Sequence, residues 1–279
     1  MTVVISSGFV VSPGLDGLNA NSPIIGYRNL VTSANVAATT QHPDWPASNL
    51  ANPSTYLKWR SGAGSPLANE YVTVTLDTAE QVDYLAIARH NFGSSRATVS
   101  VEGQSEALGS WFELITPHLL PNDGPVIFRF TKQSLFAVRL RIQASQAPLP
   151  ATPFLAVMYV GELLLLQRRI YVGHTPMPYG RRLTVANHRS IAGDFLGRVT
   201  LSEKTETTVD LKNLTPNWYR TNFEPFLVAA KEIPFFFNWR PADYPYESGY
   251  AWLAGDPQPQ NQLPNGMMQV SMNFEGIVA

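Results

Sequence analysis

The sequence predicts an all-β protein, organised as a sandwich or jelly roll. Short segments with alternating or β-branched and aromatic residues recur along the chain, and clusters rich in Gly, Pro, Ser and Asn separate them. Helical periodicity is scarce, and 44% of the 279 residues are hydrophobic, which is enough for a buried core. Several short strands divided by turn residues are typical of β-sandwiches and jelly rolls.

The predicted strands follow one another at short intervals. In Tyr71–Leu76 the valines and the leucine fall on one face and the tyrosine and threonines on the other, as in a half-buried antiparallel strand. Turn clusters at residues 61–66, 91–95 and 121–125 divide the strands. The predicted strands are Tyr71–Leu76, Tyr84–Ala88, Ala97–Val101, Val126–Phe130, Ala137–Ile142, Ala156–Leu166, Arg169–Val172, a strand that begins at Pro234 with three phenylalanines, and Met268–Phe274.

One helix is predicted, near residues 216–231. Thr215 is suited to cap its first turn, and Pro216 suits the first helical position because a proline there forgoes no intrahelical hydrogen bond. Pro225 lies inside the segment and is expected to kink or divide the helix.

Composition excludes several classes of protein. With 20 basic and 21 acidic residues the formal charge is −1, so we expect no nucleic-acid partner. The absence of cysteine excludes disulfides, thiolate metal sites and cysteine nucleophiles. The first basic residue is Arg28, which argues against a secretory signal, and the longest apolar run, Phe154–Leu166, contains Glu162 and is too short to span a membrane. We therefore expect no membrane insertion.

No common catalytic signature is present. The sequence has no Walker loop, dinucleotide-binding glycine pattern, nucleophile elbow or paired-histidine zinc helix. Asn122-Asp123-Gly124 offers oxygen ligands for calcium but has an ordinary turn composition. We therefore expect a protein that is not an enzyme, with no catalytic residue, metal or cofactor. A polysaccharide hydrolase stays open as an alternative because such enzymes use two carboxylates, and the sequence has three acidic pairs: Glu102 with Glu106, Glu203 with Glu206 and Asp243 with Glu247. The histidines are widely spaced and form no local metal-binding motif; they are His42, His90, His118, His174 and His188.

Aromatic residues in turn-rich segments supply the candidate binding sites. Tryptophan rings beside Pro, Ser, Gly and Asn can stack on sugars, although burial in a β core is their commoner role. Tyrosine and tryptophan in a proline-rich loop can anchor a protein interface. The candidate ligand-binding residues are Trp45, Trp59, Arg89, His90 and Asn91, and the candidate interface residues are Tyr244, Tyr246, Tyr250 and Trp252.

Three stretches resemble a known family. His42–Leu50 (HPDWPASNL), Lys58–Ser61 (KWRS) and Val82–Asn91 (VDYLAIARHN) together resemble a discoidin-type, galactose-binding-like jelly roll. This resemblance covers roughly residues 28 to 165 and implies a β-sandwich with ligand-binding loops at one end. Its implied ligand is a host surface glycan.

The C-terminal half carries a second resemblance. Leu214–Trp218 (LTPNW), Ile233–Pro241 (IPFFFNWRP) and Met268–Ile277 (MQVSMNFEGI) are similar to minor tail and baseplate proteins of long-tailed phages. This resemblance implies a virion structural protein, a distal-tail-like subunit assembled in the host bacterial cytoplasm, with other tail or baseplate proteins as partners and a homo-oligomeric ring, a hexamer or a trimer. A carbohydrate-binding module is the alternative.

The two resemblances together suggest three parts of the chain. We expect residues 1–27 to be an arm or strand that contributes to the assembly domain. Residues 28–166 are expected to form the discoidin-like sandwich, and residues 167–279 a β-rich tail or baseplate assembly domain that includes the helix.

Overall fold

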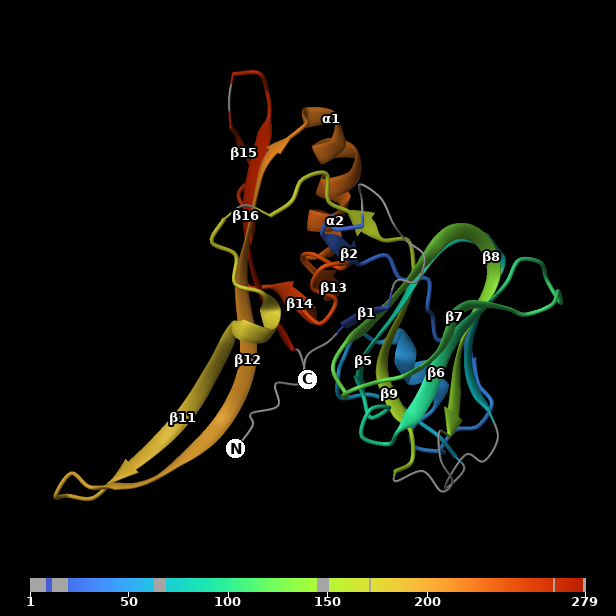
Figure 1. The fold of residues 1–279 in the computed structure, drawn as a ribbon, viewed down its shortest axis with the longest axis horizontal. Coiled ribbons are helices and arrows are strands. Elements are labelled where there is room, and N and C mark those ends of the chain that lie inside the picture. The colour runs from blue at the N-terminus through green and yellow to red at the C-terminus, as the bar shows by residue number, and fades with distance from the viewer. Residues whose placement is uncertain are drawn as a thin grey trace.

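The computed structural model describes residues 9–11, 20–62, 69–144, 151–170, 172–262 and 264–277. These residues form two eight-stranded β-sheets and one short helical segment, so the prediction of an all-β protein is confirmed (Figure 1). Within the described ranges, no helix is long and apolar enough to cross a membrane.

The first sheet folds over itself into a sandwich. Its strand order is β4-β9-β5-β8-β6-β7, with β3 paired to β5 and β1 paired in parallel to β8. The strands are β1 (Phe9–Val11), β3 (Val36–Ala38), β4 (Trp59–Arg60), β5 (Glu70–His90), β6 (Ala97–Gln104), β7 (Phe112–Leu119), β8 (Val126–Ala144) and β9 (Phe154–Gly161). A 3₁₀ turn, Ala47–Ala51, precedes β4.

The two longest strands of this sheet serve both layers of the sandwich. The first part of β5 pairs with β3, and its last part pairs with β9, while β8 runs antiparallel to β5 along most of its length. Register shifts after Thr75 and Val82 allow the pair to bend. Val72 and Leu85, from opposite parts of β5, therefore meet in one apolar core. The prediction of separate strands at Tyr71–Leu76 and Tyr84–Ala88 was wrong in that one continuous strand contains both.

The second sheet contains the rest of the chain and one early strand. Its order is β10-β2-β13-β14-β16-β12-β11, with β15 paired to β16. The strands are β2 (Ile24–Gly26), β10 (Leu164–Leu165), β11 (Arg181–Arg189), β12 (Phe195–Leu214), β13 (Phe235–Asn238), β14 (Ser248–Leu253), β15 (Gln260–Asn261) and β16 (Met268–Ile277), and a 3₁₀ turn lies at Met177–Tyr179.

Two strand predictions near the start of this sheet need correction. The predicted strand Ala156–Leu166 is divided between β9 and β10, which belong to different sheets. The described residues of Arg169–Val172 are in no strand, and Tyr171 lies outside the described residues. The apolar pattern there instead lets Ile170 pack against the core of the second sheet from a loop.

The predicted helix is present and covers one side of the second sheet. It consists of α1 (Pro216–Trp218), a π-helical turn (Tyr219–Phe223) and α2 (Glu224–Ala229). The Glu224 amide donates to the Tyr219 carbonyl, an i→i+5 bond just before Pro225, so the proline changes the helical pitch without ending the helix. Thr215 has the extended backbone of a cap, but its side chain makes no capping bond and accepts instead from Gln167 Nε2 at 2.9 Å.

A third apolar cluster joins the two sheets. Tyr84 and Tyr159 from the sandwich pack with Phe236 and Tyr250 from the second sheet, and the Phe236 and Tyr250 ring centroids lie 4.9 Å apart. A Cβ on Gly26 would lie 2.7 Å from the Tyr84 ring, so glycine permits this close approach. Tyr250 is 1% exposed, and its hydroxyl donates to the Pro53 carbonyl at 2.8 Å. Tyr250 was predicted to be an interface residue, and this prediction needs correction because its ring is buried between the two sheets of its own chain.

The hairpin of β11 and β12 projects from the second sheet. β12 pairs with β16 only from Thr205 onward, so residues 181–204 form a two-stranded arm with which no other described strand pairs (Figure 1). We call these residues the arm.

Candidate ligand-binding hollow

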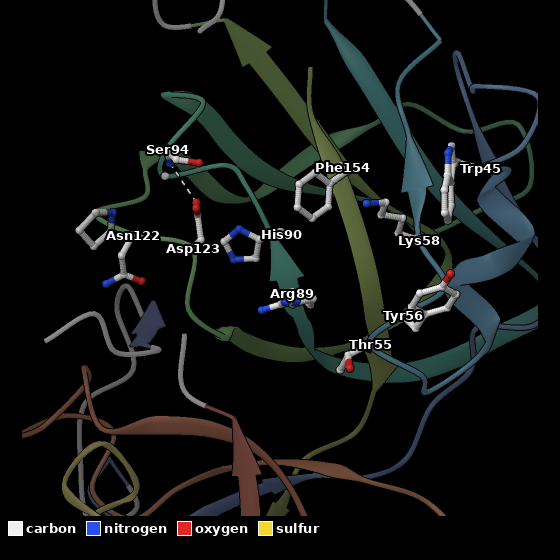
Figure 2. A pocket seen from close by; sticks show the side chains of 12 residues that line it. Trp45, Thr55, Tyr56, Lys58, Arg89, His90, Ser94, Asn122, Asp123 and Phe154 are labelled. Atoms are coloured by element: carbon white, nitrogen blue, oxygen red, sulfur yellow. Dashed lines mark hydrogen bonds between the residues drawn. The ribbon is translucent and has the colours of Figure 1, made fainter. Parts of the chain in front are cut away.

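A hollow of about 760 Å³ opens at the end of the sandwich where β5 finishes and β8 and β9 begin. Because both β8 and β9 are antiparallel to β5, their first residues lie beside its last ones. Figure 2 shows the side chains that gather there. The lining residues are Trp45, Thr55, Tyr56, Lys58, Arg89, His90, Gly93, Ser94, Pro121, Asn122, Asp123 and Phe154.

Three aromatic rings and a lysine form one side of the hollow. Tyr56 is 79% exposed, whereas Trp45 and Phe154 are half-buried. The Lys58 ammonium lies between the other two rings, 5.0 Å from the Trp45 centroid and 4.7 Å from the Phe154 centroid (Figure 2). These contacts are cation–π interactions, which hold the ammonium against an apolar surface.

His90 anchors the opposite side. Its Nε2 lies 2.9 Å from the Gly124 carbonyl, and its Nδ1 accepts the Phe92 amide at 3.2 Å. Only the neutral Nε2–H tautomer satisfies both partners, since Nδ1 must be unprotonated to accept. Burial lowers the pKa of His90 to about 4, against the influences of Asp123 and the Gly124 carbonyl, which raise it. The neutral ring therefore ties together the two loops that line this side.

The two loops are also joined directly. The Asp123 carboxylate accepts the Ser94 amide at 2.9 Å. Within the second loop, the Gly124 amide donates to Asn122 Oδ1 at 2.8 Å. A Cβ on Gly93 would clash with the backbone of Asn122, so this close approach requires glycine. Asn122-Asp123-Gly124 is thus a turn, and the described residues contain no group of three His, Asp or Glu side chains that could hold a metal ion.

Arg89 enters the hollow from a strained backbone. Its φ is 55°, in the left-handed region that residues other than glycine rarely adopt. Its neighbours Ala88 and His90 pair with β9, and its own side chain is exposed. A strained residue beside a cavity is a frequent feature of functional sites.

Three of the five predicted ligand-binding residues line the hollow, namely Trp45, Arg89 and His90. Trp59 is 0% exposed and its indole N–H donates to the Thr40 carbonyl at 2.9 Å, so it belongs to the core. Asn91 is also buried, and its side chain bonds the Thr152 carbonyl and the Phe154 amide. Both are corrected to structural residues because their polar atoms are satisfied inside the chain.

Sequence reasoning missed several residues of the hollow. Tyr56 and Lys58 lie beside the more conspicuous Trp59, and Phe154 is far from both in sequence. Only the fold brings these three residues together in one hollow. Lys58 is adjacent to Trp59 in the segment that carries the jelly-roll resemblance, which was the available signal.

Five of the six acidic residues of the hydrolase alternative form ion pairs or hydrogen bonds with other side chains. Glu102 binds Arg139 and Arg141, and Glu206 binds Arg182 and Lys204. Further acidic members also have partners: Asp243 pairs with Arg240, Glu203 with Arg181, and Glu247 accepts the Trp239 indole N–H. None of these carboxylates lines the hollow of the sandwich.

The candidate interface residues are distributed between surface and interior. Tyr244 and Tyr246 are exposed and line a smaller hollow of about 520 Å³ with Tyr179. The Tyr244 ring stacks on Trp239 with centroids 5.3 Å apart. Trp252 is half-buried on β14, and Tyr250 is buried between the sheets.

Searches with the whole sequence found no matching family model and no matching curated protein. Similar solved structures include chitosan-binding module 1 of a chitosanase/glucanase from Paenibacillus sp. IK-5, with 16% identity and a TM-score of 0.41 over 48% of this chain and 99% of the module. CpGH89CBM32-5 from Clostridium perfringens, in complex with GalNAc-β-1,3-galactose, has 10% identity and a TM-score of 0.39 over 46% of this chain and 94% of its own.

A pectin-binding carbohydrate-binding module has 12% identity and a TM-score of 0.38 over 49% of this chain and 92% of its own. None of these three is a phage tail or baseplate protein. At these identities and TM-scores, the function of the similar proteins does not transfer to this chain.

Proposed function

We propose that this chain is a glycan-binding protein and that the hollow at the end of the sandwich is its binding site. The exposed Tyr56 ring carries the proposal, because it lies in a hollow whose opposite side supplies hydrogen-bonding groups from Ser94, Asn122 and Asp123. A sugar presents an apolar face to an aromatic ring and hydroxyl groups to polar side chains. Ligand sites of this kind combine apolar surface with a few placed polar groups.

Replacing Tyr56 by alanine is expected to weaken glycan binding at least tenfold while leaving the thermal unfolding temperature almost unchanged, because an exposed ring contributes little to folding. The ligand is first identified on a glycan array, and affinities are then measured by isothermal titration calorimetry. Tyr179→Ala is the matched control, since Tyr179 is also exposed but lies in the 3₁₀ turn beside the second sheet, outside the hollow. Absence of binding to every glycan on the array would contradict the proposal.

A second candidate function is assembly into a larger particle, and the arm favours it. Six large apolar side chains of the arm are more than half exposed: Leu183, Ile191, Phe195, Leu196, Val199 and Leu201. An isolated two-stranded hairpin is marginally stable in water, and exposed apolar side chains of this number are typical of interaction surfaces. The setting that we propose for this function is the tail or baseplate of a long-tailed phage, with the chain assembled in the host cytoplasm.

The partner that the arm fits is a second copy of the chain. The arm has five basic and two acidic residues, a net charge of +3, so the rest of the chain carries −4. The arm of one copy is therefore electrostatically attracted to the body of another. Its unpaired strand edges could also add to a neighbouring sheet.

Light scattering after size-exclusion chromatography tests this assembly. The wild-type chain is expected to elute as a closed oligomer, a trimer or a hexamer, and Leu196→Lys with Leu201→Lys to shift it to the 30.8 kDa monomer. These side chains are exposed, so folding should be retained, which circular dichroism checks. A wild-type monomer at about 100 µM, well above the Kd of a stable interface, would contradict the assembly.

A further inference from the structure

Two cationic side chains, those of Lys58 and Arg89, line the hollow. Among the described residues, neither Lys58 nor Arg89 forms a salt bridge, and Asp123 is the one acidic residue in the lining. Elsewhere in the sandwich, Glu162 pairs with Arg28 and Lys132, and Glu102 pairs with Arg139 and Arg141. The hollow therefore has a local charge of +1 on a chain whose formal charge is −1.

Lys58 is held in place without being neutralised. The two rings on either side of its ammonium restrict the flexible side chain, but an aromatic ring carries no net charge. A ligand anion would therefore meet a cation whose position is already restricted, and a restricted group loses less conformational entropy on binding.

Arg89 is the second cation of the hollow, and its backbone conformation is an unfavourable one for arginine. A glycine would adopt its φ of 55° more readily than an arginine. The arginine places an exposed guanidinium at the hollow, and a guanidinium can bind a carboxylate or sulfate group through two parallel hydrogen bonds. The position therefore has a side chain suited to an oxyanion where glycine would suit the backbone better.

We infer that the ligand is an acidic glycan, whose sugar ring stacks on Tyr56 and whose carboxylate or sulfate group binds Lys58 and Arg89. This inference rests on the proposed glycan-binding function and names its class of ligand. Asp123 supplies one negative charge to the lining, and the two cations outnumber it.

Calorimetry with matched ligands tests the inference. Oligogalacturonate carries free carboxylates, its methyl ester has the same sugar backbone without the charges, and dextran sulfate supplies sulfate groups. We expect the acid to bind at least tenfold more tightly than its ester. Raising the salt concentration from 50 to 500 mM should weaken binding of the acid and leave binding of the ester nearly unchanged.

Two variants connect this preference to the cations. Arg89→Gly removes the guanidinium and relieves the backbone strain, so the variant should fold at least as well as the wild type. Lys58→Met keeps a long apolar side chain between the rings. Each should weaken binding of the acidic ligand about tenfold and change binding of the ester less than twofold. Arg169→Met is the control, since Arg169 is exposed and lies outside the hollow.

The outcomes separate this inference from the function on which it depends. Equal binding of acid and ester would overturn the acidic-glycan inference and leave glycan binding in place. Binding of neither these ligands nor any glycan on the array would overturn both. Tighter binding of dextran sulfate, lost in both variants, would support the inference with sulfate as the anion, whereas binding that neither variant changes would contradict it.

Discussion

Trp59→Ala is expected to lower the free energy of unfolding by about 3 to 5 kcal/mol, the usual cost of removing a large buried aromatic side chain. Trp59 is 0% exposed and belongs to the apolar core of the sandwich. Its replacement leaves a cavity and also removes the donor to the Thr40 carbonyl. Urea unfolding followed by circular dichroism measures the loss.

Trp45→Ala is the matched comparison for Trp59. Trp45 is half-buried and lines the hollow, so its loss should cost about 1 kcal/mol of stability but weaken glycan binding strongly. The two tryptophans are thereby distinguished as a ligand-facing ring and a core ring. If Trp59→Phe abolished glycan binding without changing the unfolding midpoint, Trp59 would instead belong to the binding site.

Lowering the pH from 7 to 4 is expected to remove about 3 kcal/mol of stability that depends on His90. Burial lowers the pKa of this histidine from 6.5 to about 4, so between these values the unfolded chain binds a proton that the folded chain does not. The stabilisation is complete above pH 6.5 and is lost as the pH falls toward 4. Protonation of Nδ1 would also break its bond with the Phe92 amide.

Asp83 has the opposite dependence on pH. Burial raises the pKa of its carboxyl from 3.8 to about 6, although the Leu163 amide, 2.7 Å from Oδ1, acts to lower it. The stabilisation that the protonated Asp83 provides is complete below pH 3.8 and is lost as the pH rises through 6. The free energy of unfolding therefore falls by about 2 kcal/mol between pH 4 and 7 on account of this group. The two groups therefore largely offset each other in the wild-type protein.

Single variants separate these contributions. The free energy of unfolding is measured at intervals from pH 7 to 4 for the wild type, His90→Gln and Asp83→Asn. Relative to His90→Gln, the wild type should lose stability on acidification, and relative to Asp83→Asn it should gain stability. Parallel curves for the wild type and His90→Gln would show that the folded protein can accommodate a charged ring at this position.

The boundaries of the long strands illustrate the limit of local patterns. Residues 77–81 are exposed and, apart from Ala79, polar, so the sequence alone suggests a break between two strands. In the fold, the pairing of β5 with β8 resumes at Glu80 and keeps the chain extended through this region. Pairing with a distant strand therefore decides whether such a stretch becomes a turn or a bend within a strand.

The candidate site shows the same limit of local patterns. Trp45, Arg89 and His90 were recognisable because they occupy segments of conspicuous composition. Tyr56 and Phe154 became part of the hollow because β9 pairs with both β4, which follows Tyr56, and β5. The difference in burial between Trp45 and Trp59 also depends on which segments cover each ring.

The sequence by itself determined the all-β class, the helix that begins at Pro216 and most strand positions, because alternation and proline act through the local backbone. Only the tertiary structure decided which loops meet at the hollow, which aromatic rings remain exposed, and that Tyr250 packs between the sheets. These features arise from contacts between residues distant in sequence, and local patterns do not specify which distant partners will meet.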